Sequence, residues 1–359
     1  MTSTPAIQSS TLPPAQPLYI LRGHKAQVHV VGFIRGNRRL LTGDADGFVV
    51  SWDIVSKRPK VVWRAHLKAI LGLEGWGEDR VVSSTYTTPE ATNSVLVAVP
   101  GTKEGHVDIF SLPSEQRLHS IPPAEEGKTG MVMALRILYV KNTLHLITGT
   151  ESGLTSVQKL NSNTKNWETT YISKPHTQPI LSLDVTSITH PLATASASDI
   201  RYFTSSADAL ITMNPLQNPV EHKPLKVSQT KHSGQQSLSV RSDGKIFATA
   251  GWDGRIRVYS AKSLKELAVL KWHKEGVYGV AFSVIRSETV EKTTDLTVKE
   301  EGDDGSGGGK NEVGTQVATQ SVTPISSGIV RRKREEKALE THWLAAGGKD
   351  GKVSLWEVY

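Results

Sequence analysis

One hairpin recurs several times along this sequence, and the repetition constrains the fold more than any other feature. In its clearest copy an apolar segment from Leu40 leads to Asp46-Gly47 and then to an alternating segment that ends in Trp52. Asp-Gly pairs tolerate the positive φ angles of tight β-turns, and alternation is typical of a strand with one buried face. Because one hairpin cannot bury its own apolar face, we expect neighbouring copies to stack.

The copies share a register that can be counted from the acidic residue of the turn. A small residue precedes the acid by four positions, Gly often follows it, and an aromatic residue comes six positions later. The six copies, some of them degraded, are Thr42-Asp46-Gly47-Trp52, Pro100-Glu104-Gly105-Phe110, Thr148-Ser152-Gly153-Gln158, Thr204-Asp208-Ala209-Asn214, Thr249-Asp253-Gly254-Tyr259 and Ala346-Asp350-Gly351-Trp356. Six hairpins in one register predict an all-β repeat fold.

A short apolar run stands upstream of most hairpins, and a His precedes some of these runs, as His24 does after Gly23. Four short strands per unit, with Gly-His early and Trp-Asp late, resemble the WD40 repeat of β-propellers. In WD40 repeats these positions form a structural hydrogen-bond network. The resemblance therefore implies structural roles for His24, Thr42, Asp46, Trp52, Asp253, Tyr259, His273, Asp350 and Trp356.

The hydroxyl, imidazole and carboxylate of Thr42, His24 and Asp46 could also suggest a catalytic triad. A catalytic site occurs once, however, whereas these positions recur around the chain, which favours the structural interpretation. Phosphate-binding loops, nucleophile elbows and zinc motifs are absent. The remaining His residues, such as His176, have no partner at metal-ligand spacing, and we expect them in loops or on strand surfaces. The sequence predicts no enzyme, no cofactor and no metal site.

The two ends of the chain predict how the ring closes. The last hairpin ends at Tyr359 without a fourth strand, while Leu18 to Leu21 form an isolated apolar run before Gly23. We expect this N-terminal strand to complete the last blade, because that pairing removes exposed sheet edges. The expected domains are a disordered Ser/Thr/Pro tail at 1–17 and one propeller at 18–359, with a disordered insertion at about 286–338 inside the last blade.

Composition narrows the remaining possibilities. The 359 residues include no Cys, which excludes disulfides, and no apolar run approaches the ~20 residues of a membrane span. The net charge of +7 is compatible with acidic partners, although we expect no direct binding to nucleic acid or membranes. The basic cluster Arg331, Arg332, Lys333 and Arg334 is a candidate nuclear-import signal, with a solvated loop base, or a helix through Glu340, as the alternative.

Candidate partner-binding residues lie near the expected turns. Trp252 and Trp272 fall outside the aromatic position of the repeat, and exposed Trp is enriched in binding hot spots. Packing between blades is the alternative for both. Lys25, Lys274 and Lys349 lie in the same expected loops and would favour acidic ligands.

Several stretches resemble a more specific family, the fungal ASTRA-associated protein 1. They include Leu21 to His24, Lys68 to Arg80, Tyr202 to Ala209, His232 to Gln236 and Thr341 to Gly347, and they span nearly the whole chain. The resemblance implies a nuclear, non-catalytic scaffold of the ASTRA chromatin-remodelling assembly. Implied partners are a kinase-related (PIKK) protein, its co-chaperones and AAA+ ATPases.

The family pattern implies seven blades, and here the second is short. Asp46 and Glu104 are 58 residues apart, whereas two repeats of the usual period need roughly 80–90. We expect a seven-bladed template with a truncated second blade and six complete hairpins. A six-bladed ring with an insert at 80–94 is the alternative.

Two other binding functions remain open. A ubiquitin-ligase substrate receptor often carries Arg two residues after Trp-Asp, but Val55 and Tyr359 occupy the corresponding region here. A histone-tail or phosphopeptide reader would use basic loop residues such as Lys68. A hydrolytic propeller would need acids or His gathered at the channel, which the sequence does not indicate.

Overall fold

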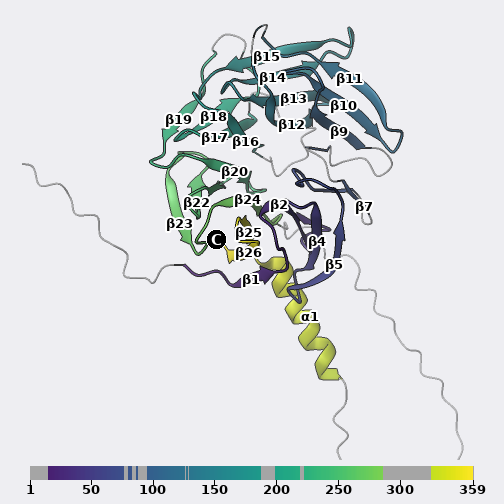
Figure 1. Ribbon diagram of the computed structural model, residues 1–359, viewed down its shortest axis with the longest axis vertical. Coiled ribbons are helices and arrows are strands. Elements are labelled where there is room, and N and C mark those ends of the chain that lie inside the picture. The colour runs from purple at the N-terminus through teal and green to yellow at the C-terminus, as the bar shows by residue number, and fades with distance from the viewer. Residues whose placement is uncertain are drawn as a thin grey trace, which may run out of the picture.

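The structure, a computed structural model, describes residues 15–76, 80–82, 86–87, 95–125, 127, 129–186, 199–218, 222–285 and 325–358. Within these ranges the chain forms strands β1 to β26 and the helix α1. The strands make six four-stranded antiparallel sheets and a two-stranded sheet, and Figure 1 shows the sheets arranged as blades.

In five of the six four-stranded blades the strands follow in chain order from the inside outward. The first three in sequence are β2 (Val28–Ile34), β3 (Arg39–Asp44), β4 (Phe48–Asp53) and β5 (Arg58–Arg64); β8 (Tyr86–Thr87), β9 (Val95–Pro100), β10 (Val107–Leu112) and β11 (Gln116–Ile121); and β12 (Val132–Val140), β13 (Thr143–Thr150), β14 (Thr155–Leu160) and β15 (Trp167–Ser173). The next two are β16 (Ile180–Val185), β17 (Arg201–Ser206), β18 (Leu210–Pro215) and β19 (Lys226–Gln229); and β20 (Gln235–Val240), β21 (Ile246–Gly251), β22 (Arg255–Ser260) and β23 (Glu266–Lys271).

The last blade joins the two ends of the chain, as the sequence predicts. It contains β24 (Val277–Phe282), β25 (Trp343–Gly348) and β26 (Lys352–Glu357), and β1 (Tyr19–Arg22) pairs antiparallel with β26 as its outer strand. A buried cluster shared with the first blade includes Leu21, Val28, Trp52 and Leu355. Closure therefore buries apolar side chains from both ends of the chain in one core.

The all-β propeller fold and the six complete hairpins are confirmed. Between β5 and β8 the chain forms only the two-stranded sheet of β6 (Glu74–Trp76) and β7 (Arg80–Val82). This sheet occupies the place in chain order that the seven-bladed template gives to its truncated blade. The count of seven is not confirmed and stays a prediction.

Gly47 shows why the hairpins need their Gly. Its φ is +84°, in the left-handed region, and a Cβ placed there would lie 1.9 Å from the carbonyl oxygen of His66. An L side chain would meet both the backbone penalty and the next segment of the chain.

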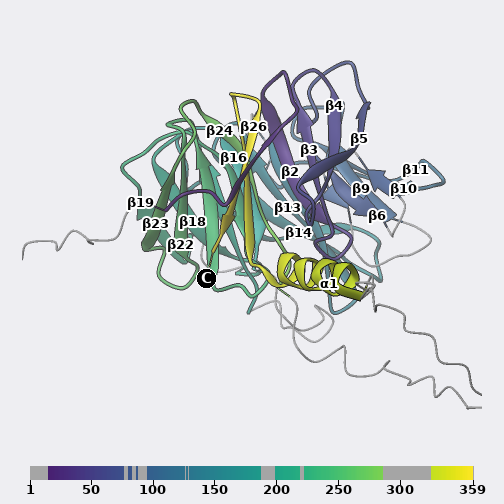
Figure 2. The ribbon, with the colours of Figure 1, turned by 90° about the horizontal axis from the view of Figure 1, so that it is seen from below.

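The expected insertion is partly ordered. Residues 1–14 and 286–324 lie outside the described residues, so those parts of the disorder prediction stay untested. Disorder was the wrong prediction for residues 325–338, because the helix α1 spans Ile325–Glu340. Buried Ala338 and Leu339 attach its end to the propeller, and Trp343 Nε1 donates to the Ala338 carbonyl at 2.7 Å. In Figure 2 this helix runs along the underside of the blades.

Candidate interaction face and central channel

The strand order defines two faces of the propeller. In the first blade the start of β2 pairs with the end of β3, so the turn between β3 and β4 lies at the end where the inner strand begins. The other five four-stranded blades follow the same strand arrangement, and we call this side the turn face. The helix α1 follows the end of β24 and precedes β25, which places it on the opposite face.

His24 forms the predicted hydrogen-bond network in the first blade, but with a different acid. Its Nδ1 lies 2.8 Å from Asp44 Oδ2, and its Nε2 lies 2.6 Å from Thr42 Oγ1, which also accepts from Trp52 Nε1 at 2.8 Å. The prediction of Asp46 was wrong: Asp46 is exposed, and its backbone N–H donates to Asp44 Oδ1. An ionised Asp44 only accepts, so His24 donates from Nδ1 and accepts at Nε2.

The last blade repeats this network with its hydroxyl on another strand. His273 Nδ1 lies 3.2 Å from Asp350 Oδ1, and Nε2 lies 2.9 Å from Ser354 Oγ, which accepts from Trp356 Nε1 at 2.8 Å. Ser354 on β26 therefore supplies the hydroxyl that Ala346 lacks. Burial lowers the pKa of His273, and the Asp350 carboxylate only partly opposes that shift.

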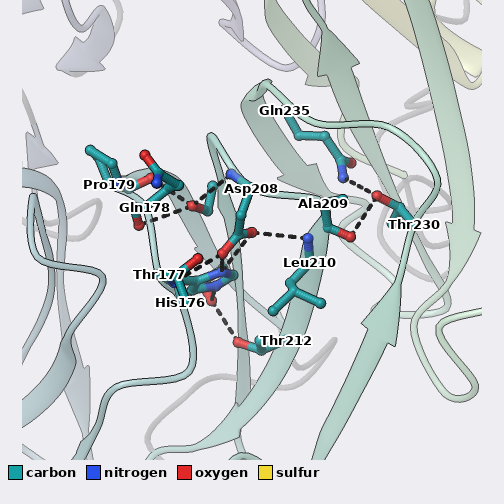
Figure 3. A network of polar contacts seen from close by, with 12 residues as sticks. His176, Thr177, Gln178, Pro179, Asp208, Ala209, Leu210, Thr212, Thr230 and Gln235 are labelled. Carbon is teal, nitrogen blue, oxygen red and sulfur yellow. Dashed lines mark hydrogen bonds and ion pairs between the residues drawn. The ribbon is translucent and has the colours of Figure 1, made fainter.

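A third network surrounds His176, which sequence reasoning placed among loop or strand-surface residues. That prediction was wrong, since its side chain is fully buried. Its Nδ1 lies 3.1 Å from both carboxylate oxygens of Asp208, and its Nε2 lies 2.8 Å from Thr204 Oγ1. Figure 3 shows the imidazole directed at Asp208.

Further contacts complete this third network. Asp208 also accepts from the backbone N–H groups of Thr177 and Leu210. Burial raises the pKa of the Asp208 carboxyl, but the hydrogen bonds and charge of His176, together with these N–H groups, hold it below its usual range. Thr204 Oγ1 lies 2.6 Å from Thr212 Oγ1, to which Asn214 Nδ2 donates at 2.9 Å. Asn214 thus supplies the N–H that Trp supplies in the other two blades.

In the blade of β20 to β23 an arginine replaces the histidine. Arg257, whose side chain is 1% exposed, donates from both terminal nitrogens to Asp253 at 3.1 and 2.6 Å. Burial opposes ionisation of Asp253, but its bonds with Arg257 hold the carboxyl pKa below its usual value. Beside them, burial raises the pKa of Tyr259 to about 12.

The connectivity around His24 resembles that of a catalytic triad, but its accessibility does not. The side chains of His24 and Asp44 are 1% and 3% exposed, and Thr42 is fully buried. A nucleophile must meet its substrate, so these groups stabilise the blade. Among the described residues, no three His, Asp or Glu side chains gather as metal ligands would, and no helix has the length and apolar character to cross a membrane.

The predicted partner-binding residues all lie on the turn face. Lys25 and Lys274 precede the inner strands β2 and β24, and Lys349 lies in the β25–β26 turn; all three are exposed. Trp252 is 48% exposed, and its Nε1 donates to Gln236 Oε1 at 2.8 Å. Trp272 instead packs on the core of the last two blades and contacts His273 edge-on.

The inner strands surround a central channel of about 550 Å³. Arg136 of β12 lies 3.8 Å from Glu74 of β6 and 3.8 Å from Asp184 of β16, and all three line the channel. Burial raises the pKa of Glu74, an effect that Arg136 opposes and Asp184 reinforces. Charges inside the channel are therefore largely matched within the protein.

The basic cluster lies on α1 rather than in a loop. Arg332, Lys333 and Arg334 are exposed, and Arg332 Nε pairs with Glu336 Oε1 at 2.9 Å one helical turn later. The side chain of Arg331 lies outside the described residues. The cluster is thus on the face opposite the lysines of the turn face.

Comparison with known proteins identifies the class of repeat that these blades represent. A family model described as WD domain, G-beta repeat matches residues 15–53 and 223–260. The chain is also similar to a solved structure, the β-propeller domain of Cps50 (Swd1) from Myceliophteria thermophila, with a TM-score of 0.58 and 15% identity over 96% of this chain and 100% of that one. The protein is a WD40-repeat β-propeller.

Curated relatives specify the family. ASTRA-associated protein 1 of Verticillium alfalfae is 37% identical over 99% of this chain and 96% of its own length. The proteins of the same name from Aspergillus niger and Schizosaccharomyces pombe are 35% and 29% identical over 97% and 74% of this chain, covering 98% and 93% of their own lengths. The chain belongs to the ASTRA-associated protein 1 family. The Verticillium alignment covers 420 positions, so that relative carries residues that this 359-residue chain lacks.

Proposed function

We propose that this protein is a non-catalytic scaffold subunit of the ASTRA complex that works in chromatin remodelling and in the assembly of a PIKK-family protein. Its partners would include that kinase-related protein, its co-chaperones and AAA+ ATPases. The observation that carries the proposal is family membership over 99% of the chain. A WD40 propeller offers large faces for binding, which suits a subunit that holds other proteins together.

The surface chemistry supports a role in binding. Exposed Trp252 and three exposed lysines share the turn face, and aromatic residues are enriched in interfaces whereas catalytic groups need access to substrate. The His-Asp-hydroxyl sets are buried in the blades. These features favour a scaffold over a hydrolytic propeller.

We also propose that the protein acts in the nucleus and that the basic cluster on α1 directs its import. Arg332, Lys333 and Arg334 are exposed on a helix that is attached to the propeller near Ala338. Replacing the three by Ala should move a fluorescent fusion from the nucleus to the cytosol, whereas Lys165→Ala and Lys265→Ala should leave it in place. Unchanged nuclear fluorescence in the triple variant would rule out import through this cluster.

Affinity purification from the source cells, followed by mass spectrometry, tests the scaffold proposal. The proposal expects co-purification of a large kinase-related protein with ASTRA-type subunits. Recovery of a ubiquitin-ligase adaptor or of histones in their place would favour the substrate-receptor or reader alternative. Recovery of no ASTRA-type subunit would contradict the main proposal.

A further inference from the structure

Five inner strands carry a β-bulge at the same position, one residue after the strand begins. The pairing register shifts in β2, β12, β16, β20 and β24, and the residues at these shifts are His29, Met133, Leu181, Gln236 and Tyr278. All five line the central channel, and they lie at its turn-face end. Bulges are common next to functional sites, where they redirect a side chain.

Leu71 adds a sixth side chain to this set. The residue before it, Ile70, packs against Gly43 of the first blade, as Ile180 packs against Gly149 and Val28 against Gly347. In the segment after β5, Leu71 therefore occupies the position that the bulge residues occupy in the other blades, and it also lines the channel. We call Leu71 and the five bulge residues the bulge ring.

We propose that the bulge ring is a socket for an apolar side chain carried by an acidic segment of a partner protein. The inference rests on the proposed scaffold function and names the chemistry of the segment that this face binds.

The ring presents two exposed apolar side chains. Leu71 is 75% exposed and Met133 is 43% exposed, so a partner that covered them would gain the free energy of burying apolar surface. The imidazole of His29 stacks on Tyr278 with 5.5 Å between ring centroids. Burial lowers the pKa of His29, with Asp44 only partly opposing the shift, so the ring is uncharged at neutral pH.

The channel favours one inserted side chain over a charged ligand. Its volume of about 550 Å³ exceeds that of any amino-acid side chain, while Glu74, Arg136 and Asp184 along its wall already pair with one another. An isolated charge placed among them would lose hydration without gaining an unpaired partner. Trp252, whose Nε1 bonds to Gln236 of the ring, extends the apolar surface outward along the turn face.

Charge around the ring identifies the flanking chemistry of the partner. Three lysines lie close to the ring. Lys25 comes a few residues before His29, and Lys274 a few residues before Tyr278. The backbone N–H of Lys349 donates to the Gly276 carbonyl at 2.8 Å, in the segment that leads to Tyr278. In the part of the chain that the structure describes, none of these three lysines forms an ion pair. On the same face, the carboxylates of Asp44 and Asp350 are bound by His24 and His273. Acidic residues on both sides of the apolar anchor complement this pattern.

Fluorescent peptides test the socket directly. The principal probe has one Leu flanked on both sides by Asp and Glu; its two controls replace Leu by Ala or the acids by Lys. We expect the wild-type protein to bind the principal probe about tenfold more tightly than either control, as for an anchor in a pocket. Equal binding of all three peptides, or binding of none, would overturn the proposal, as would preference for the Lys-flanked peptide.

Matched variants place the binding site. L71D and M133D should weaken binding of the principal probe about tenfold, whereas L267D, at a 56% exposed position on the outer strand β23, should bind as wild type does. A triple K25A, K274A and K349A variant leaves the ring intact and should weaken binding and reduce its dependence on salt. Wild-type binding by both the ring variants and the lysine variant would overturn the proposal.

The same variants in cells separate this inference from the scaffold function. If wild type and L267D recover ASTRA-type subunits while the double variant L71D/M133D loses one of them, both proposals are supported. Equal recovery by L71D/M133D would overturn the socket and leave the scaffold function standing. If wild type recovers no ASTRA-type subunit, the scaffold function fails whatever the peptides show.

Discussion

His24 donates from Nδ1 to Asp44 at 2.8 Å, while Asp46, at the turn position of the repeat, is exposed. The two acids are two residues apart and have different roles. Asp44 also accepts from the backbone N–H groups of Asp46 and Phe48, so it joins the network to the turn.

Asp44→Ala should therefore destabilise the protein, and Asp46→Ala should not. Removing the buried carboxylate leaves His24 and two backbone donors without their acceptor, a loss of about 1–3 kcal/mol. Asp46→Ala should change the free energy of unfolding by less than about 0.5 kcal/mol, as is usual at exposed positions. Chemical denaturation of the wild type and the two variants measures both changes in the free energy of unfolding. Equal losses would contradict the assignment of Asp44, rather than Asp46, to the network.

Ser354→Ala tests the network of the last blade. The change removes the oxygen that accepts from Trp356 Nε1 and bonds to His273 Nε2, and both partners are buried. We expect a loss of about 1–3 kcal/mol in the free energy of unfolding. Ser120→Ala, at an exposed position of β11, is the control and should be nearly neutral. A similar stability for both variants would show that the hydroxyl of Ser354 is dispensable.

Asp253→Ala tests the arginine that replaces histidine in the blade of β20 to β23. Without Asp253 the buried guanidinium of Arg257 loses its two hydrogen bonds and, among the described residues, keeps only the ion pair with Glu266 at 3.6 Å. Because Asp253 is one-third exposed, we expect a moderate loss of about 2–3 kcal/mol. Arg255→Ala removes a more exposed pair at 3.9 Å and should cost under about 1 kcal/mol. Thermal unfolding of the two variants should differ accordingly.

The fold was largely predictable because the hairpins repeat. Turn residues at one spacing predicted the six complete hairpins, and an isolated apolar run predicted that β1 would close the ring. A helix through Glu340 was only one alternative for the basic cluster, and the segment to 338 was assigned to disorder, because half of the residues of α1 are charged and only Ala338 and Leu339 are buried among its described side chains. Burial of its end against Trp343 depends on tertiary contacts that local patterns do not specify.

The networks were predictable where the repeat keeps its residue types. His176 was missed because Asn214 replaces the expected aromatic residue, although Asp208 was present in register. The hydroxyl of Ser354 was missed because it lies on the strand opposite Ala346, where a linear motif does not search. The bulges of the inner strands depend on pairing between strands, so no single sequence position reveals them.

Acidification should lower stability in two steps. Burial lowers the pKa of His273 below its ordinary value of about 6.5, so the unfolded chain binds this proton more readily than the folded protein. This contribution is complete above pH 6.5 and decreases as the pH falls toward the folded pKa. The lowered pKa of Asp208 makes a second contribution, which is complete above about 4 and is lost as the pH falls through the folded pKa.

Melting temperatures measured from about pH 8 to about pH 3 check the direction of both changes in stability. Wild-type protein should melt at lower temperature as pH falls through the first window. His273→Asn should flatten that part of the curve in part, because His29, His119 and His145 also have lowered pKa values. His222→Asn, at an exposed position, should leave it unchanged. A melting temperature that rises toward pH 5 would contradict the signs.

Lysine footprinting of the assembled complex tests the central claim most directly, namely that the turn face holds the partners. Acetylation of Lys25, Lys274 and Lys349 should fall in the complex relative to the isolated protein, while Lys165 and Lys265, exposed in turns at the opposite ends of the strands, should react equally in both. Unchanged reactivity at the three turn-face lysines, with protection at Lys165 and Lys265, would contradict the account.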